Sequence, residues 1–358
     1  MNFEFLLGKN LIPDFLIRFG IRRMLANKLR LESAGGPREI EKRFQTYLAE
    51  LRRSPIAILT DKANEQHYEL PPAFFRAVLG KHLKYSSGYW RDLKCPLPPR
   101  GQAEFDASEE AMLELYAQRS DLKDGQAILD LGCGWGSFSL WAAKKFPNSK
   151  ITGISNSAPQ RLFIEHEAKL RGLTNLHIVT SNMNTFDTPD RFDRILSVEM
   201  LEHMRNYGPL FKKISDWMKE DACFFVHIFA HRTLAYPFID EGSGSWMARY
   251  FFSGGQMPSR DLFSFFQEDL KLCQQWTVNG KHYQKTCEAW LKKMDAAQEH
   301  IMPLFEETYG LRNALRWWVY WRVFFMACAE LFGFRGGTEW AVEHYLFTKK
   351  SSAVRDQT

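Results

Sequence analysis

Two carboxylates and an imidazole fall within five positions, as Glu199, Glu202 and His203 in the stretch VEMLEHM. A carboxylate can bind and orient a cation, and an imidazole with an ordinary pKa of about 6.5 can exchange a proton at neutral pH. On a helical turn, residues 199 and 203 share one face and residue 202 sits beside them. The stretch is therefore a candidate acid–base site, and a solvated helix surface is the alternative.

The stretch follows one of several short apolar segments that alternate with helical ones. Such an alternation predicts an α/β fold, a parallel sheet with helices on both faces, in which ligands bind at the C-terminal ends of the strands. The cluster is then expected at the ligand edge of the sheet. The expected strands are 127–133, 150–155, 176–182, 192–199, 223–230 and 343–350, and the expected helices in this region are 137–146 and 158–172.

A glycine-rich loop ends the first of these strands, in the sequence LDLGCGWG. Its glycines allow a sharp turn and a close approach of a ligand to the backbone at the start of a helix. A dinucleotide site would read G-x-G-x-x-G, and this loop reads G-x-G-x-G, which points away from nicotinamide cofactors. The pattern instead resembles the first motif of class I S-adenosyl-L-methionine-dependent methyltransferases. The residues concerned are Asp130, Gly132, Gly134 and Gly136.

Further stretches are similar to the cyclopropane fatty acid synthase family: YSSGYW (85–90), GISNSAPQ (153–160), LEHM (201–204), VHI (226–228) and GGQMPS (254–259). Within that family the chain most resembles the plant coclaurine N-methyltransferases, including LIPDFLIRFGIRRMLANKLR (11–30) and GKHYQKTCEAWLKKMDA (280–296). The resemblance implies a Rossmann-like methyltransferase fold, with S-adenosyl-L-methionine as the cofactor.

The same resemblance implies a set of cofactor contacts. Asn182 stands where related methyltransferases often carry an acid, so the adenine contact departs from the family pattern. The expected contacts are Tyr85 and Ser86, which would close over the cofactor, Gly132 and Gly134 at its methionine part, Ser155 and Gln160 at its ribose side, Asn182 and Met183 at its adenine, and Asn156 as a further neighbour.

The cyclopropane synthases hold a bicarbonate base with a cysteine, a glutamate, a histidine and a tyrosine. The matching positions here are Ser87, Glu202, His227 and Tyr283, so a serine replaces the cysteine. The lipid-modifying members also carry glycine where this chain has Glu199, whereas the N-methyltransferases carry glutamate. Both departures favour an amine acceptor, and an alkene in a lipid acyl chain remains the alternative.

Methyl transfer to an amine poses a proton problem. The reaction is an in-line displacement that needs aligned reactants and little water, but an aliphatic amine is mostly protonated at neutral pH and must lose a proton. His203 is expected to take it, with Glu199 and Glu202 orienting the ammonium. The expected catalytic set is Glu199, Glu202, His203, His227 and Tyr283. If this cluster instead faces solvent, the chain is expected to be a non-catalytic cofactor-binding module.

Other classes of partner find less support in the sequence. EMLEHM stands where a nucleobase methyltransferase should carry an Asn/Asp-Pro-Pro-aromatic motif, and no basic stripe with interleaved aromatic residues suits nucleic acid. No compact set of metal ligands is evident. The expected partner is a small molecule, preferably an aromatic amine. The basic amphipathic segment 11–31 more often packs on its own domain but could contact a membrane surface, and a homodimer is also compatible with the sequence.

The division of the 358-residue chain follows from changes in composition. Six cysteines without C-x-x-C pairs, the lack of a signal peptide and the lack of a run of roughly 18 apolar residues predict a reduced, cytoplasmic protein. A capping box at Asp106 and Glu109 is expected to begin the core. The expected parts are 1–105, an N-terminal helical cap; 106–234, the cofactor-binding core; 235–340, a helical lid; 341–350, a final strand; and 351–358, a disordered tail.

Overall fold

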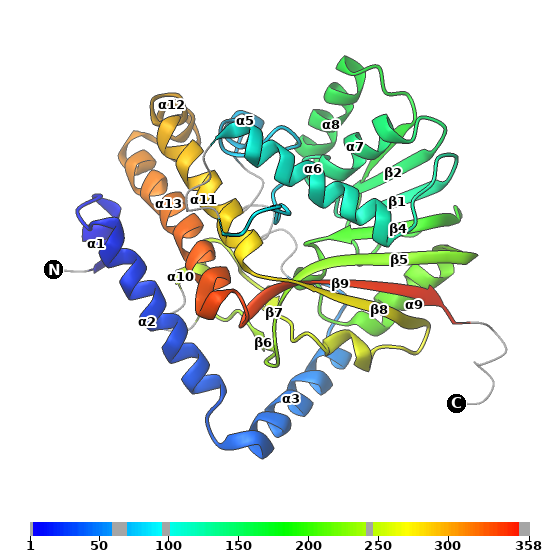
Figure 1. The fold of residues 1–358 in the computed structure, drawn as a ribbon, viewed down its shortest axis with the longest axis horizontal. Helices are drawn as coiled ribbons and strands as arrows, with labels where there is room; N and C mark the ends of the chain where they lie inside the picture. Colours follow the sequence, from blue (N-terminus) through cyan, green and yellow to red (C-terminus); the bar gives the residue numbers. More distant parts are fainter. Residues whose placement is uncertain (1–2, 59–69, 95–100, 241–245, 351–358) are drawn as a thin grey trace.

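A seven-stranded sheet forms the centre of the computed structural model, which describes residues 3–58, 70–94, 101–240 and 246–350 (Figure 1). The strand order is β3-β2-β1-β4-β5-β9-β8; the first five strands are parallel, and β9 runs antiparallel to both of its neighbours, β5 and the edge strand β8. The sheet strands are β1 (Ala127–Leu131), β2 (Lys150–Ser155), β3 (Leu176–Thr180), β4 (Phe192–Val198), β5 (Met218–His231), β8 (Leu270–Val278) and β9 (Trp340–Lys349).

Helices cover both faces of the sheet because consecutive strand residues point to opposite sides. Ile128 and Leu196 pack with the helices α6, α7 and α8, whereas their neighbours Leu129 and Ile195 pack with α3 and α9. The helices of the two layers are α3 (Gly36–Arg53), α6 (Gln102–Arg119), α7 (Ser137–Lys145), α8 (Ala158–Leu170) and α9 (Tyr207–Trp217).

The remaining elements lie beyond the C-terminal ends of the parallel strands, where Figure 1 shows a group of helices beside the sheet. They include the first two helices of the chain and much of the segment between β5 and β9, apart from the sheet strand β8. No helix in the described part of the chain is long and apolar enough to cross a membrane. These elements are α1 (Phe3–Gly8), α2 (Asp14–Glu32), α5 (Pro72–Val78), β6 (Tyr236–Pro237), α10 (Trp246–Tyr250), β7 (Gln256–Met257), α11 (Lys281–Ala296), α12 (Gln298–Tyr309) and α13 (Leu311–Gly333), with short 3₁₀ turns at Leu201–His203, Leu262–Phe265 and Phe334–Gly336.

The predicted α/β alternation is confirmed, including the start of α8, where the Ser157 hydroxyl accepts a hydrogen bond from the backbone N–H of Gln160. The stretch 235–340 differs from the expected helical lid because it also contains the edge strand β8. Its sequence, LKLCQQWTV, is half exposed and lacks a regular apolar alternation, so no strand signal was visible. The last strand begins at Trp340, three residues before the expected strand and one before the expected boundary at 341, and the tail 351–358 lies outside the described residues.

The predicted capping box is wrong, because α6 begins at Gln102 and places Asp106 and Glu109 inside the helix. The buried Glu109 carboxylate instead accepts hydrogen bonds from the backbone N–H groups of Gly80, at 3.0 Å, and His82, at 2.7 Å. Asp106 accepts one from the N–H of Lys81 at 2.9 Å. Helix α6 therefore fixes the loop that leads into the YSSGYW stretch.

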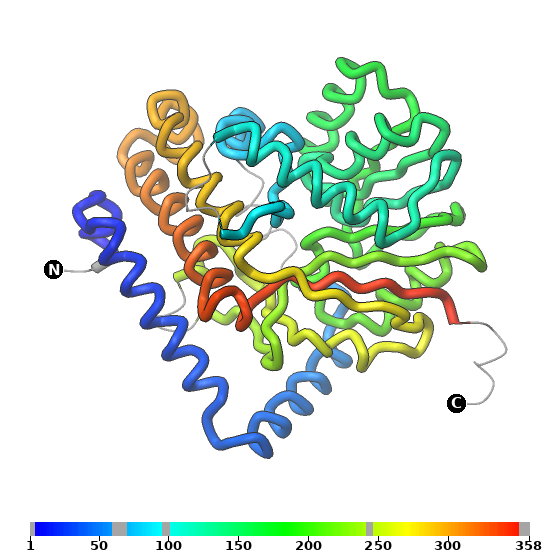
Figure 2. The backbone as a smooth tube through the Cα atoms, in the orientation of Figure 1, coloured from blue at the N-terminus to red at the C-terminus, as the bar shows by residue number. Residues whose placement is uncertain are grey.

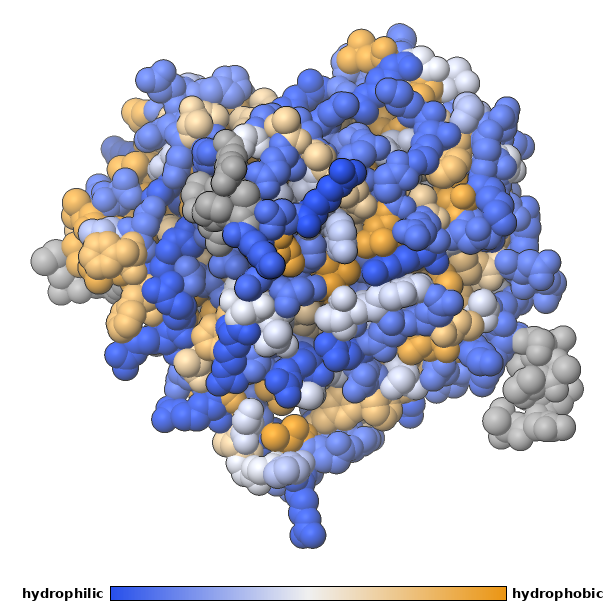
Figure 3. Space-filling view, viewed as in Figure 1, coloured by the Kyte–Doolittle hydropathy of each residue, from blue (hydrophilic) through white to orange (hydrophobic). Residues whose placement is uncertain are grey.

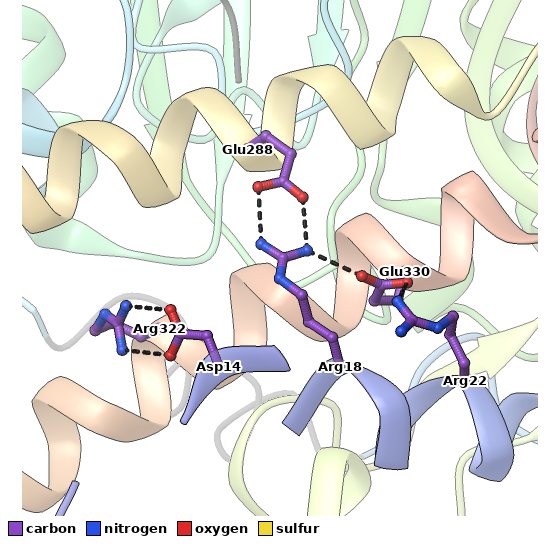
Figure 4. Close-up of polar contacts among 6 residues, drawn as sticks. All are labelled: Asp14, Arg18, Arg22, Glu288, Arg322 and Glu330. Atoms are coloured by element: carbon purple, nitrogen blue, oxygen red, sulfur yellow. Dashed lines mark hydrogen bonds and ion pairs between the residues drawn. The ribbon is translucent and has the colours of Figure 1, made fainter. Parts of the chain in front are cut away.

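Helix α2 lies beside α13 (Figure 2) and is fastened to α11 and α13 by ion pairs (Figure 4). The Arg18 guanidinium donates to both Glu288 oxygens, at 2.7 and 2.9 Å, and to Glu330 at 3.0 Å. One turn later Arg22 donates to Glu330 at 2.9 Å, and Arg322 donates back to Asp14 at the start of α2. The predicted packing of the basic segment on its own domain is confirmed.

Removal of the Arg18 guanidinium should weaken the attachment of α2 to α11 and α13. In Arg18→Met the Glu288 and Glu330 carboxylates, whose side chains are only 11% and 12% exposed, lose their shared partner, which is costly for shielded charges. We expect amide hydrogen exchange across residues 14–32 to accelerate about tenfold. The matched control is Arg23→Met, which removes a cation of the same helix outside this ion-pair set; equal exchange in the two variants would contradict the fastening role.

Candidate active site

Two adjoining cavities lie at the C-terminal ends of the parallel strands. The larger, of about 540 Å³, is enclosed by the glycine loop, by the 199–202 stretch and by residues of α2, α10, α11 and α13. The smaller, of about 80 Å³, lies beyond the ends of β2 and β3. Gly132, Gly134 and Glu199 line both cavities, so the two spaces meet at the glycine loop.

Positive φ angles shape the glycine loop, at +80° for Gly132, +53° for Gly134 and +79° for Gly136. A Cβ atom on Gly134 would meet no described atom within 4 Å, so this position borders open cavity space. A Cβ on Gly136 would lie 2.8 Å from the Ile164 side chain, and Gly136 lines neither cavity. Gly136 is therefore needed for packing of α7 against α8, not at the cavity wall.

The predicted cofactor residues divide between the two cavities. Tyr85, Ser86 and Asp130 line the larger one, whereas the smaller is lined by the set at the ends of β2 and β3. The buried Gln160 side chain bonds Ser155 through its oxygen, at 2.7 Å, but its amide nitrogen has no hydrogen-bond partner within the described ranges. The free amide of Gln160 fits the adenosine end of S-adenosyl-L-methionine, and the open turn at Gly134 fits its methionine end. The smaller-cavity set is Ser155, Asn156, Gln160, Asn182 and Met183.

The acid–base stretch is not the helical turn that the sequence suggested. Glu199 has a left-handed backbone with φ of +48°, and the 3₁₀ turn begins only at Leu201. Glu199 and Glu202 line the larger cavity, whereas His203 lines the smaller one and stacks on Phe252 with ring centroids 5.0 Å apart. The two carboxylates are brought together, and the imidazole faces the other cavity.

Glu199 is held by side chains from two other elements. The Tyr283 hydroxyl on α11 donates to its Oε2 at 2.6 Å, and the His227 Nε2 on β5 lies 3.3 Å from its Oε1. His227 and Tyr283 are two of the residues expected to hold a bicarbonate. The position expected to replace the cysteine, Ser87, lines neither cavity and donates to the carbonyl of Gly88 at 2.9 Å. The donors of the expected anion site thus contact the glutamate carboxylate.

Burial controls the protonation of these groups. Burial raises the pKa of Glu199 to about 7, against the opposing effects of the Tyr283 hydrogen bond and the Lys84 charge. Burial and the neighbouring Glu199 charge raise the pKa of Glu202 well above its usual range. Glu202 Oε2 is buried with no hydrogen-bond partner among the residues that the structure describes. The neighbouring positive charge is therefore too small to balance the carboxylates of both Glu199 and Glu202.

The expected pKa of His203 is wrong, because burial lowers it to about 4. The neutral ring is a poor match for a base that works at neutral pH. Glu202 lines the larger cavity, and its Oε2 has no hydrogen-bond partner among the described residues, which leaves that oxygen able to accept a proton. The sequence pattern named these three residues as candidates but could not show how burial shifts the pKa of each.

Two features of the site were missed. Lys84 is fully buried, lines the larger cavity and donates to Ser86 Oγ, and burial lowers its pKa to about 7. Its position directly before YSSGYW was the available signal. The inner face of α2 also lines this cavity, through residues such as Ile17 and Gly20. Helical spacing predicted only that this face packs inward.

Comparisons with known proteins show which family the chain belongs to. The sequence profile described as mycolic acid cyclopropane synthetase matches residues 58–337. The chain belongs to this family. It is 38% identical over 344 residues to (S)-coclaurine N-methyltransferase of Thalictrum flavum subsp. glaucum, covering 95% of this chain and 93% of that protein. It is 36% identical over 308 residues to pavine N-methyltransferase of the same plant, covering 85% and 84%.

A solved structure extends the similarity to the whole fold. The crystal structure of coclaurine N-methyltransferase bound to N-methylheliamine and SAH superposes with a TM-score of 0.91 and 34% identity, covering 97% of this chain and 98% of that one. The chain is an S-adenosyl-L-methionine-dependent methyltransferase with a Rossmann-like fold, as predicted. The roles of individual side chains remain predictions.

The glycine loop provides a direct test of cofactor binding. A valine side chain at Gly134 would enter the space shared by the two cavities, so Gly134→Val should weaken S-adenosylhomocysteine binding at least 100-fold by titration calorimetry. Gly125→Val is the matched control, because Gly125 also has positive φ, +88°, with open space around it but lines neither cavity. Wild-type affinity in Gly134→Val would refute the assignment.

Proposed function

We propose that the enzyme methylates the nitrogen of a secondary or tertiary amine on an aromatic small molecule, of the tetrahydroisoquinoline class. The observation that carries this proposal is the pair Glu199 and Glu202, buried in the larger cavity with one carboxylate oxygen lacking any described partner. An ammonium group supplies the missing charge and donor in one step. The names of the similar plant enzymes support an alkaloid amine.

The walls of the larger cavity suit an aromatic acceptor. They carry Trp246, Phe252, Trp290 and Phe332, which offer faces for a ring and for a cation. The indole N–H groups of Trp246 and Trp290 are buried without a hydrogen-bond partner in the described structure. They are donors for oxygen substituents on the acceptor ring. The cavity volume of about 540 Å³ lies within the usual range for small-molecule sites.

In the proposed mechanism Glu202 removes the proton. S-Adenosyl-L-methionine supplies an electrophilic methyl group on a sulfonium. Glu199, held by Tyr283 and His227, orients the acceptor ammonium, and Glu202 Oε2 accepts its proton to expose the nitrogen lone pair. Burial and the neighbouring Glu199 charge raise the pKa of Glu202, so its carboxylate binds a proton more readily than an exposed one. His203 shapes the wall of the smaller cavity in this scheme.

An alkene acceptor is less well served by the same geometry. That reaction needs a separate anion to take a proton from carbon, held by free donors. Here Tyr283 and His227 already contact Glu199, and Ser87 faces a backbone carbonyl. The fixed carboxylate therefore stands in for a bound anion and leaves the cavity suited to a cation. This contrast favours the amine over the lipid.

Association with a membrane surface or a second copy, and a cytoplasmic location, stay predictions. The surface for either contact would be the outer side of α1 and α2, where Figure 3 shows apolar side chains gathered. Phe5, Phe15 and Phe19 are exposed there at 57%, 67% and 53%, next to Arg23. This face is separate from the α2 face that lines the cavity.

Isotope-labelled S-adenosyl-L-methionine tests the function. Incubation with tetrahydroisoquinolines and, separately, with unsaturated phospholipid vesicles should place label on the amine nitrogen and none in lipid, as read by mass spectrometry. Glu202→Gln should lower kcat by about 10²- to 10⁴-fold while S-adenosylhomocysteine affinity stays within twofold. Glu114→Gln, at an exposed carboxylate on α6, is the control. Label in lipid, or full turnover in Glu202→Gln, would contradict the proposal.

A further inference from the structure

A buried chain of side chains leads from Glu199 along the face of the sheet that α6 covers. His227 Nδ1 on β5 lies 2.9 Å from His344 Nε2 on β9, and His344 Nδ1 lies 2.5 Å from a terminal nitrogen of Arg119 on α6. With His227 Nε2 facing Glu199 at 3.3 Å, the chain joins four elements. His227 and His344 are both completely buried.

The directions of these hydrogen bonds follow from the donor at the end of the chain. A guanidinium can only donate, so His344 Nδ1 must accept and its proton lies on Nε2. His344 Nε2–H then donates to His227 Nδ1, which leaves the proton of His227 on Nε2. His227 Nε2–H therefore donates to Glu199. The one non-titrating member, Arg119, fixes every proton position along the chain.

The surroundings keep both rings neutral, as this order requires. Burial, together with the charges of Arg119 and Lys84, lowers the pKa of His344 and of His227 well below the usual value. The Tyr116 hydroxyl lies 2.9 Å from the same His227 Nδ1 and can donate to it only if that nitrogen carries no proton. The hydroxyl can also accept a hydrogen bond, so Tyr116 is compatible with either tautomer, and the assignment follows from Arg119 alone.

We propose that Arg119, acting through His344, is a positioning residue that fixes His227 as the Nε2–H tautomer and so holds the Glu199 carboxylate in the acceptor cavity. The opposite tautomer would turn a lone pair toward the carboxylate and remove one of its two hydrogen-bond donors. The catalytic consequence rests on the proposed amine methylation, but the tautomer does not. Arg119 lines neither cavity, so it acts without touching either ligand.

Nitrogen NMR of ¹⁵N-histidine-labelled protein shows which ring nitrogen carries the proton. Wild-type His227 and His344 should both appear as Nε2–H tautomers, with signals assigned by His227→Gln and His344→Gln. In Arg119→Leu the His227 signals should shift toward a mixture, and Arg119→Lys, which keeps a donor, should restore them at least in part. A wild-type His227 protonated on Nδ1 would overturn the proposal, even if the variants fold poorly.

Kinetics separate positioning from a structural role. Arg119→Leu should lower kcat about tenfold with S-adenosylhomocysteine affinity within twofold of wild type. Trp276→Leu controls for the other contact of Arg119, whose guanidinium lies 4.7 Å from that ring, and should leave kcat and both tautomers unchanged. Unchanged His227 signals in Arg119→Leu would refute the inference. If NMR shows the predicted tautomers but no amine is methylated, the proposed function is refuted and the positioning role of Arg119 still holds.

Discussion

A carboxylate buried at the end of a strand must find donors, and the Glu199 carboxylate finds them on separate parts of the chain. Tyr283 comes from α11, His227 from β5, and the Lys84 charge from the loop before α6. These contacts require the core sheet and the helices beyond it to keep fixed positions relative to each other. Glu199 has a left-handed backbone and lines both cavities, so this one residue lies where the two spaces meet.

The segments far from the core in sequence complete the site. Helix α2, fastened by Arg18 to α11 and α13, closes one wall of the larger cavity. Helix α6 holds the loop before Lys84 through the buried Glu109 carboxylate. Ion pairs and buried hydrogen bonds at a distance from the chemistry thus decide the shape of the space in which an acceptor is aligned, which is the main demand of methyl transfer.

The sequence predicted the parts of the fold that local rules govern. The loop at Gly132 and Gly134 and the helix that begins at Ala158 have short-range signals, and both lie where expected. The edge strand β8 and the hydrogen bonds of Glu109 depend on distant partners, so the local pattern misled at both. The protonation of His203 depends on burial, which spacing does not reveal. The candidate site residues came from the acid–base pattern and from resemblance, and their proposed tasks come from the geometry.

The central claim is that the Glu199 and Glu202 carboxylates select a cation. Its most direct test compares the affinity of a tetrahydroisoquinolinium with that of a neutral analogue in which carbon replaces the nitrogen, for wild type and for Glu199→Gln. A charge-assisted hydrogen bond should favour the cation in wild type by about 10- to 100-fold, and most of that preference should disappear in the variant. Equal affinities for both compounds in wild type would contradict the claim.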